Sequence, residues 1–227
     1  MTFQPDYPGA IVVPAHADNF GGYGRLNVPR AWVLHTPEEP ADDYESTPDW
    51  FANPQAQAST HYYVDNDGDV YQMVSEQDCP WANGNRGGVN RTWKGIKDAW
   101  PPWAEVGVSL NCQTLSVEIE GRAASIGDTL TDVQFDALVR LIKHRGNVYG
   151  IPYDRDHVIG HFEIATDRTD PGIWFPWTRL MEALVAEPVP PFDITNIRLE
   201  PVGPPTYHWT DDPYIREQRQ MVRLIVD

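Results

Sequence analysis

The sequence predicts an α/β or α+β fold built on one main sheet. Short β-prone segments recur along the chain, and segments with helical periodicity lie between and after them. The chain has 227 residues, of which 41% are hydrophobic, and this is enough for one domain with appendages.

The first part of the chain predicts an extension followed by a strand and a hairpin. Residues 1–30 are rich in Pro and Gly, and we expect them to form an N-terminal extension that packs on the domain. Residues 31–35 (AWVLH) predict a short buried strand that ends in a histidine. Residues 61–64 and 69–74 are β-prone and flank Asn66-Asp67-Gly68. Asp-Gly between two such runs predicts a β-hairpin.

The second part of the chain alternates between strand and helix patterns. Thr131 followed by Gln134 matches a capping box, and the apolar stripe after it predicts a helix that stops at Gly146 or Gly150. Three further segments have clear patterns: strands at 114–119 (TLSVEI) and 157–161 (HVIGH), and a helix at 177–186.

Four segments lack a regular period. The acidic stretch 38–49 predicts a solvated loop, with a cation-binding patch as the alternative. Residues 84–106 predict a long loop that is functional or mobile. Residues 187–192 (EPVPPF) predict a Pro-rich linker. Residues 193–227 are too few for an independent core, and they form a C-terminal appendage of unknown role.

Composition excludes two classes of function. Seventeen basic residues against 33 acidic ones give a net charge of −16, which excludes a duplex nucleic-acid binder that relies on a basic surface. The longest apolar runs are far shorter than the roughly 20 residues that cross a bilayer. The first residues also lack the basic and apolar regions of a secretory signal, so we expect no signal peptide and no membrane span.

Three residues have the chemistry of a hydrolytic metal site. His35 and His161 each close an apolar strand-like run, and Asp170 follows nine residues after His161 in an Asp-Pro-Gly turn. Two histidines and a carboxylate would leave one tetrahedral position open for water. The alternative is a pair of hydrogen-bonded core histidines and a turn aspartate. His157 is a weaker ligand, because on a strand it lies about 13 Å from His161, at roughly 3.3 Å per residue.

Two other patterns resemble functional motifs. Residues 65–76 carry acids with the spacing of a calcium loop, but Val70 stands where that loop requires glycine, so we favour the hairpin. Cys112 precedes a strand and has no helix N-terminus to lower its pKa, which disfavours a catalytic cysteine. Cys79 and Cys112 are either one disulfide or two buried thiols.

Four ordered blocks resemble the type 2 N-acetylmuramoyl-L-alanine amidases, a family that includes phage endolysins, wall-recycling amidases and peptidoglycan recognition proteins. The blocks are WVLHT, ASTHYYVDNDGDVYQMVSEQDCPWANGN, TLSVEIEG and HVIGHFEIATDRTDPGIWFPW, and they cover about residues 10–186. The resemblance implies a central, mainly mixed sheet flanked by helices, with a zinc site in a surface groove. It also implies that residues 1–186 form the catalytic domain.

The resemblance assigns roles to five residues. His35, His161 and Asp170 match the family's ligands for one Zn²⁺ per chain. Glu118 matches its general base, which would take a proton from water and pass it to the leaving amine. Arg168 stands two residues before Asp170, at the position that is often Lys, and it would stabilise the oxyanion without shuttling a proton; a plain salt bridge is its alternative role. Glu120, on the same strand face as Glu118, is the competing base.

The substrate contacts are less regular than the ligand set. Thr60 stands before His61, where some relatives have Tyr, and Trp81-Ala82-Asn83 replaces a Trp-His pair. We expect Trp81, Asn83, Thr60 and Trp93 to contact substrate, while each tryptophan could instead close the core.

The implied function is hydrolysis of the amide between N-acetylmuramic acid and L-alanine in peptidoglycan, in the manner of an endolysin. A non-catalytic peptidoglycan-binding domain and a different wall hydrolase are the alternatives. A phage lysin would be made in the host cytoplasm and reach the wall after a holin opens the membrane, whereas a recycling amidase would stay cytoplasmic. We expect a monomer whose partner is peptidoglycan, without nucleic acid.

Overall fold

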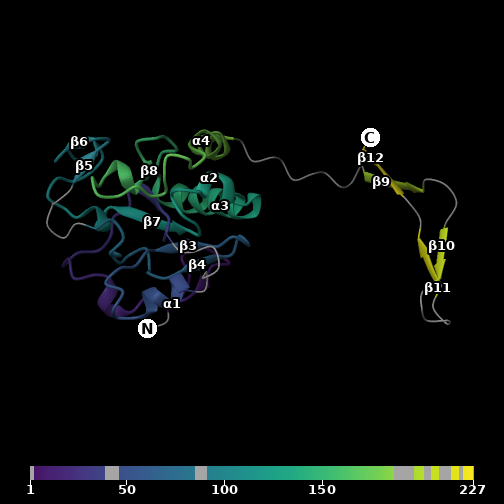
Figure 1. Ribbon diagram of the computed structural model, residues 1–227, viewed down its shortest axis with the longest axis horizontal. Coiled ribbons are helices and arrows are strands. Elements are labelled where there is room, and N and C mark those ends of the chain that lie inside the picture. Colours follow the sequence, from purple (N-terminus) through teal and green to yellow (C-terminus); the bar gives the residue numbers. More distant parts are fainter. Residues whose placement is uncertain are drawn as a thin grey trace. The chain divides into compact units, whose positions relative to one another are not determined.

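The computed structural model describes residues 3–38, 46–84 and 91–186, together with four strands of the C-terminal part, 197–201, 206–209, 216–219 and 222–226. The chain divides into two compact units, Met1–Val185 and Ala186–Asp227 (Figure 1).

The first unit is organised around a six-stranded mixed sheet in the order β1-β4-β3-β7-β2-β8. Its strands are β1 (Ile11–Val12), β2 (Ala31–His35), β3 (Tyr62–Val64), β4 (Val70–Gln72), β7 (Thr114–Ile119) and β8 (Val158–Gly160). Only β3 and β4 pair antiparallel, and the other neighbours within this sheet are parallel. This arrangement confirms the predicted strands and the predicted mixed sheet.

The two faces of the sheet have different roles because side chains alternate along each strand. Trp32 and Leu34 of β2 and Val117 of β7 belong to the main apolar core. That core is shared with three helices, α2 (Ile126–Thr129), α3 (Asp132–Tyr149) and α4 (Trp177–Val185). The alternate positions, among them His35 and Glu118, therefore point to the opposite face.

Helix α3 begins and ends as its sequence predicts, with one difference. The Thr131 hydroxyl accepts a hydrogen bond from the Gln134 amide at 3.1 Å, and Gly150 in the left-handed conformation ends the helix. The Gln134 side chain does not complete the capping box. It donates instead to the carbonyls of Val64 and Glu120, which ties the start of the helix to two strands.

The predicted hairpin is confirmed, and it does not have the form of a calcium loop. β3 and β4 pair antiparallel, and Oδ1 of Asp65 accepts hydrogen bonds from the backbone amides of Asp67 and Asp69. Glu76, at the last position of the calcium-like spacing, is buried and accepts from Arg145 and other side chains.

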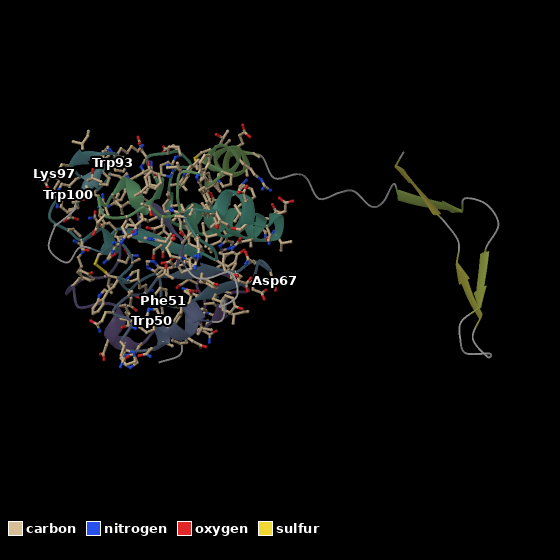
Figure 2. All side chains as sticks on the ribbon, viewed as in Figure 1. Trp50, Phe51, Asp67, Trp93, Lys97 and Trp100 are labelled. Carbon is tan, nitrogen blue, oxygen red and sulfur yellow. A yellow bond between two sulfur atoms is a disulfide. The ribbon has the colours of Figure 1, made fainter. Side chains whose placement is uncertain are left out.

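The end of the acidic stretch is helical, so the prediction of a solvated loop over 38–49 was wrong for residues 46–49. Helix α1 spans Ser46–Ala52 and carries Trp50 and Phe51 (Figure 2). Phe51 is buried in a cluster with Tyr63 of β3 and with Met73, which directly follows β4. Burial of this aromatic ring stabilises the helix against the sheet. Residues 39–45 lie outside the described residues.

The segment predicted as a long loop contains a short hairpin. β5 (Thr92–Trp93) pairs antiparallel with β6 (Ile96–Lys97). Trp93 packs against Val33, Ile159 and Ile164, which fixes this hairpin to the face of the sheet that carries His35 and Glu118. Residues 85–90 lie outside the described residues.

The two cysteines form a disulfide, which resolves the alternative that the sequence left open. Cys79 and Cys112 lie 4.8 Å apart at their Cα atoms and are both buried. The bond joins the segment after β4 to the 3-10 helix η2 (Leu110–Cys112), directly before β7.

The N-terminal extension is hydrogen bonded to the sheet region. Asp6 accepts from the Gln72 side chain and from the Glu76 amide, and the Asn27 side chain donates to the carbonyls of Glu76 and Thr114. A 3-10 helix, η1 (Ala17–Asn19), lies within the extension.

The second unit is described by its strands alone. β9 (Ile197–Pro201) pairs antiparallel with β12 (Val222–Val226), and β10 (Thr206–Trp209) pairs antiparallel with β11 (Arg216–Arg219). The predicted linker, 187–192, lies outside the described residues. None of the helices in the described part of the chain is long and apolar enough to cross a membrane.

Candidate metal centre

Two of the predicted site residues come together because of the register of parallel strands. β2 and β7 run side by side, and their pairing sets His35 directly beside Glu118. β8 pairs with the other edge of β2, and His161 follows at its end in the 3-10 helix η3 (His161–Glu163). The carboxyl ends of these strands meet at one edge of the sheet, which is a common place for a binding site.

Asp170 reaches the same place through a tight turn. The Phe162 amide donates to the Asp170 carbonyl at 3.1 Å, so the turn folds back onto η3. Gly172 has φ +98°, and a Cβ there would lie 2.2 Å from the Ala123 carbonyl oxygen. Glycine is therefore required where the turn presses against the neighbouring backbone.

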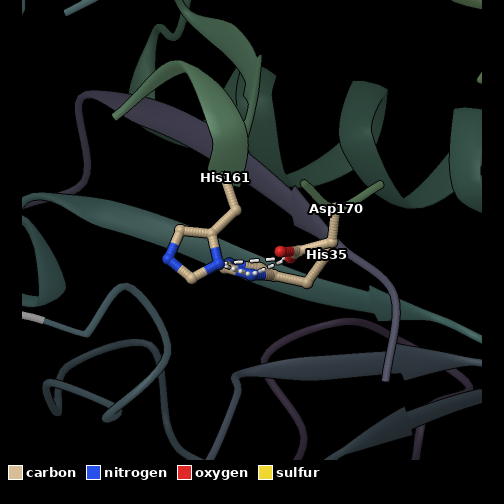
Figure 3. A group of neighbouring side chains, drawn as sticks. All are labelled: His35, His161 and Asp170. Atoms are coloured by element: carbon tan, nitrogen blue, oxygen red, sulfur yellow. Dashed lines mark hydrogen bonds and ion pairs between the residues drawn. The ribbon is translucent and has the colours of Figure 1, made fainter. Parts of the chain in front are cut away.

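The three side chains converge at the spacing of a metal site (Figure 3). Nδ1 of His35 lies 3.1 Å from Nδ1 of His161 and 3.1 Å from Oδ2 of Asp170, and the third distance is 3.2 Å. Tetrahedral ligands about 2.0–2.1 Å from zinc lie roughly 3.3–3.4 Å from one another. The donor set and its spacing fit a single zinc ion.

Electrostatics favour a neutral His35 and an ionised Asp170. Burial lowers the pKa of His35, and the neighbouring His161 lowers it further, against the opposing effect of Asp170. Burial alone would raise the pKa of Asp170, but hydrogen bonds from His161 and His35 outweigh it and hold that pKa well below its usual range. Neutral imidazoles and an ionised carboxylate are the forms that bind a metal.

The cluster opens into a groove with a volume of about 600 Å³. The three clustered residues line this groove, and so do Glu118, Arg168 and Trp81. The sequence predicted Glu118 and Arg168 for catalysis and Trp81 for substrate contact. Arg168 is half-exposed and forms an ion pair with Asp167 at 3.4 Å. Its guanidinium therefore stays at the rim of the groove.

Three predicted substrate residues do not line this groove, and we correct their interpretation. Thr60 is fully buried and hydrogen bonds to Ser116. Trp93 belongs to the apolar core described above. Asn83 is 4% exposed and donates through its side chain to Thr114. We therefore no longer assign these three buried residues to substrate contact.

The other candidates for general base, metal ligand and nucleophile interact with residues outside the cluster. Glu120 accepts hydrogen bonds from the backbone and side chain of Asn66, so it holds the β3–β4 turn. Nδ1 of His157 pairs with Asp154 at 2.7 Å. Cys112 is in the disulfide, which excludes it as a free thiol nucleophile.

The sequence did not identify the wall of the groove that helix α1 supplies. Trp50 and Gln57 line the groove, and so does Glu38, whose carboxylate accepts from the Ala123 amide. A usable signal was present, because Ser-Thr-Pro-Asp at 46–49 before Trp50-Phe51 has the capping-box spacing that opens a helix.

Comparisons with known proteins agree with this geometry. The family described as N-acetylmuramoyl-L-alanine amidase matches residues 25–173. N-acetylmuramoyl-L-alanine amidase A of Achromobacter lyticus is 29% identical over 192 residues, which cover 76% of this chain and 92% of that protein.

Solved structures show the same fold. A selenomethionine derivative of AmpD has a TM-score of 0.56 at 22% identity, and covers 81% of this chain and 99% of its own. PlyL has a TM-score of 0.55 at 16% identity, with 79% of this chain and 99% of its own covered. With the family match over most of the first unit and the ligand cluster in place, the chain belongs to the N-acetylmuramoyl-L-alanine amidase family.

Proposed function

We propose that this protein is a zinc-dependent amidase that cleaves the bond between N-acetylmuramic acid and L-alanine in peptidoglycan. Family membership supports the amidase activity. The observation that carries the zinc dependence is the cluster of His35, His161 and Asp170, whose ligand atoms have tetrahedral spacing at the base of a groove.

The donor set suits zinc and leaves room for catalysis. Two imidazoles and one carboxylate would hold the ion and leave one ligand position for water, as in catalytic rather than structural zinc sites. Zinc held there would polarise the substrate carbonyl and lower the pKa of water.

Glu118 is the residue that would move protons. It lies beside His35 in the strand register and lines the groove, so its carboxylate is next to the ligand cluster. It would take a proton from the attacking water and deliver it to the leaving amine of L-alanine. Arg168 would stabilise the negative charge that develops on the carbonyl oxygen, because its guanidinium keeps its charge.

The groove also suits a peptide joined to a sugar. Trp50 is 48% exposed on one side, and Trp81 lines the groove with its indole nitrogen donating to the Gly21 carbonyl. Anchored indole rings offer flat apolar surfaces to sugar rings or stem-peptide side chains. Trp81 therefore stays in our assignment of substrate contacts, and Trp50 takes the place of Thr60, Asn83 and Trp93.

The test combines metal content with product chemistry. The purified full chain, digested against peptidoglycan and a defined muropeptide panel, should release lactyl-sugar products and peptides with a free L-alanine amine, as seen by mass spectrometry. Glu118→Gln should keep its zinc and lose about 10²–10⁴-fold in turnover. Glu120→Gln is the matched control two residues on, directly after the same strand, and should stay close to the unaltered rate.

The alternative is a domain that binds peptidoglycan without cutting it. Retention of all three ligands and Glu118 favours the hydrolase. Binding to peptidoglycan without release of L-alanine amines, in a zinc-loaded sample, would refute the catalytic proposal.

We further propose an endolysin-like role, in which residues 1–186 are catalytic and residues 193–227 are an appendage. Activity on intact cell walls, compared with activity on soluble muropeptides, distinguishes an endolysin-like amidase from a wall-recycling one. A lytic enzyme should clear walls added from outside, whereas a recycling enzyme should prefer the soluble fragments.

A further inference from the structure

We propose that Asn83 is a positioning residue for the metal centre: its side-chain oxygen accepts a hydrogen bond from Nε2 of His35 and so directs Nδ1 of His35 to the metal. The inference rests on the proposed metal centre and adds a residue that the sequence assigned to substrate binding.

The orientation of the Asn83 amide follows from the hydrogen bonds around it. The Thr114 hydroxyl donates its proton to the Leu110 carbonyl at 2.9 Å. It can then only accept from Asn83, 2.9 Å away, so the group that faces Thr114 is the amide NH₂. The amide oxygen of Asn83 must point to the other side.

The imidazole of His35 requires a hydrogen-bond acceptor at Nε2. Its Nδ1 faces His161 and Asp170 in the cluster. Its Nε2 is buried, as is Oδ1 of Asn83, and both atoms lack a hydrogen-bond partner among the described residues. A histidine that binds a metal through one nitrogen carries its proton on the other, and that N–H needs an acceptor.

The two side chains belong to the same part of the fold. Asn83 stands between Ala82 and Gly84, which line the same groove as His35. The Asn83 side chain interacts directly with the His35 imidazole.

Asn83 is held on a rigid support. Its backbone amide donates to Oδ1 of Asn111 at 2.8 Å, and the Cys79–Cys112 disulfide joins the two segments involved. Asn83 and Thr114 are both buried. The support therefore fixes the acceptor, and through it the ring of His35, before any metal binds.

Two variants separate this role from simple packing. Asn83→Leu keeps a similar shape and removes the acceptor, and Asn83→Asp keeps an oxygen toward His35. Both lose the amide proton that Thr114 accepts, so a purely structural role would affect them equally. We expect zinc affinity, measured on the full chain by competition with a chelator, to fall about 10–100-fold in Asn83→Leu. It should stay within about 3-fold in Asn83→Asp.

A second measurement on the unaltered, zinc-loaded chain keeps the inference testable if a variant does not fold. Nitrogen-15 NMR should show a proton on Nε2 of His35 that exchanges slowly with water. Equal loss of affinity in both variants, no loss in Asn83→Leu, or a proton on Nδ1 of His35 would each overturn the inference. If the unaltered chain binds no zinc, the metal centre fails and this inference fails with it.

Discussion

The pH dependence of stability should be controlled in part by His61, a buried histidine outside the metal cluster. Its side chain is 0% exposed. Nδ1 accepts from the Ser116 amide at 3.0 Å, and Nε2 lies 3.2 Å from the Asp78 carbonyl. Burial lowers the pKa of His61 from 6.5 to about 4, because a protonated ring would be desolvated and would face the Ser116 N–H with a second proton.

The direction and the size of this pH effect on stability follow from the difference between the pKa of His61 in the folded and the unfolded chain. The unfolded chain takes up a proton on His61 near pH 6.5 and the folded chain only near pH 4, so stability is complete above pH 6.5 and is lost as the pH falls. A difference of about 2.5 pKa units corresponds to about 3 kcal/mol in total. By pH 4.5 about 2.5 kcal/mol of this should be lost.

Urea unfolding at a series of pH values between 7.5 and 4.5 measures this loss. His61→Gln offers an amide that can accept from Ser116 and donate to Asp78, and it does not titrate. The variant should therefore lose about 2.5 kcal/mol less than the unaltered chain over that interval. Other acid-sensitive groups, Asp170 among them, act on both proteins and cancel in the difference. Identical pH slopes for the two proteins would refute the reasoning.

Two further predictions concern the core and the metal-bearing turn. Arg145→Met should destabilise the first unit by about 3–5 kcal/mol in urea unfolding, because buried Glu76 loses its charged partner, and a loss below 1 kcal/mol would contradict this. Gly172→Ala should weaken zinc binding, measured by chelator competition, because its Cβ collides with the Ala123 carbonyl and displaces Asp170; unchanged affinity would show that the turn has another way to adapt.

The strands were predictable because short apolar or alternating segments identify them locally. The candidate ligands were predictable because two of them stand at the ends of such segments. Short apolar runs such as 31–35 and alternation in 114–119 identified β2 and β7. A histidine or glutamate at the end of such a strand must point to the face opposite the apolar core. The sequence offered His35, His161 and Asp170 as candidate ligands with core histidines as the alternative, the family pattern favoured the ligands, and the structure brings the three side chains together.

The remaining features depend on contacts that no local pattern contains. Burial of Phe51 stabilises helix α1 at the end of an acidic segment. This helix then supplies residues that line the groove. The position of Asn83 depends on Thr114 and on a disulfide that spans 33 residues. Tertiary packing therefore decided whether a polar or aromatic residue faces the groove or lies behind it.

The central claim is that His35, His161 and Asp170 hold one metal ion beside Glu118. X-ray absorption at the zinc edge of the loaded chain tests it most directly, together with metal counting. We predict one zinc per chain with nitrogen and oxygen neighbours at about 2.0–2.1 Å, and no zinc in Asp170→Ala. Sulfur neighbours, or full zinc loading in Asp170→Ala, would contradict the account.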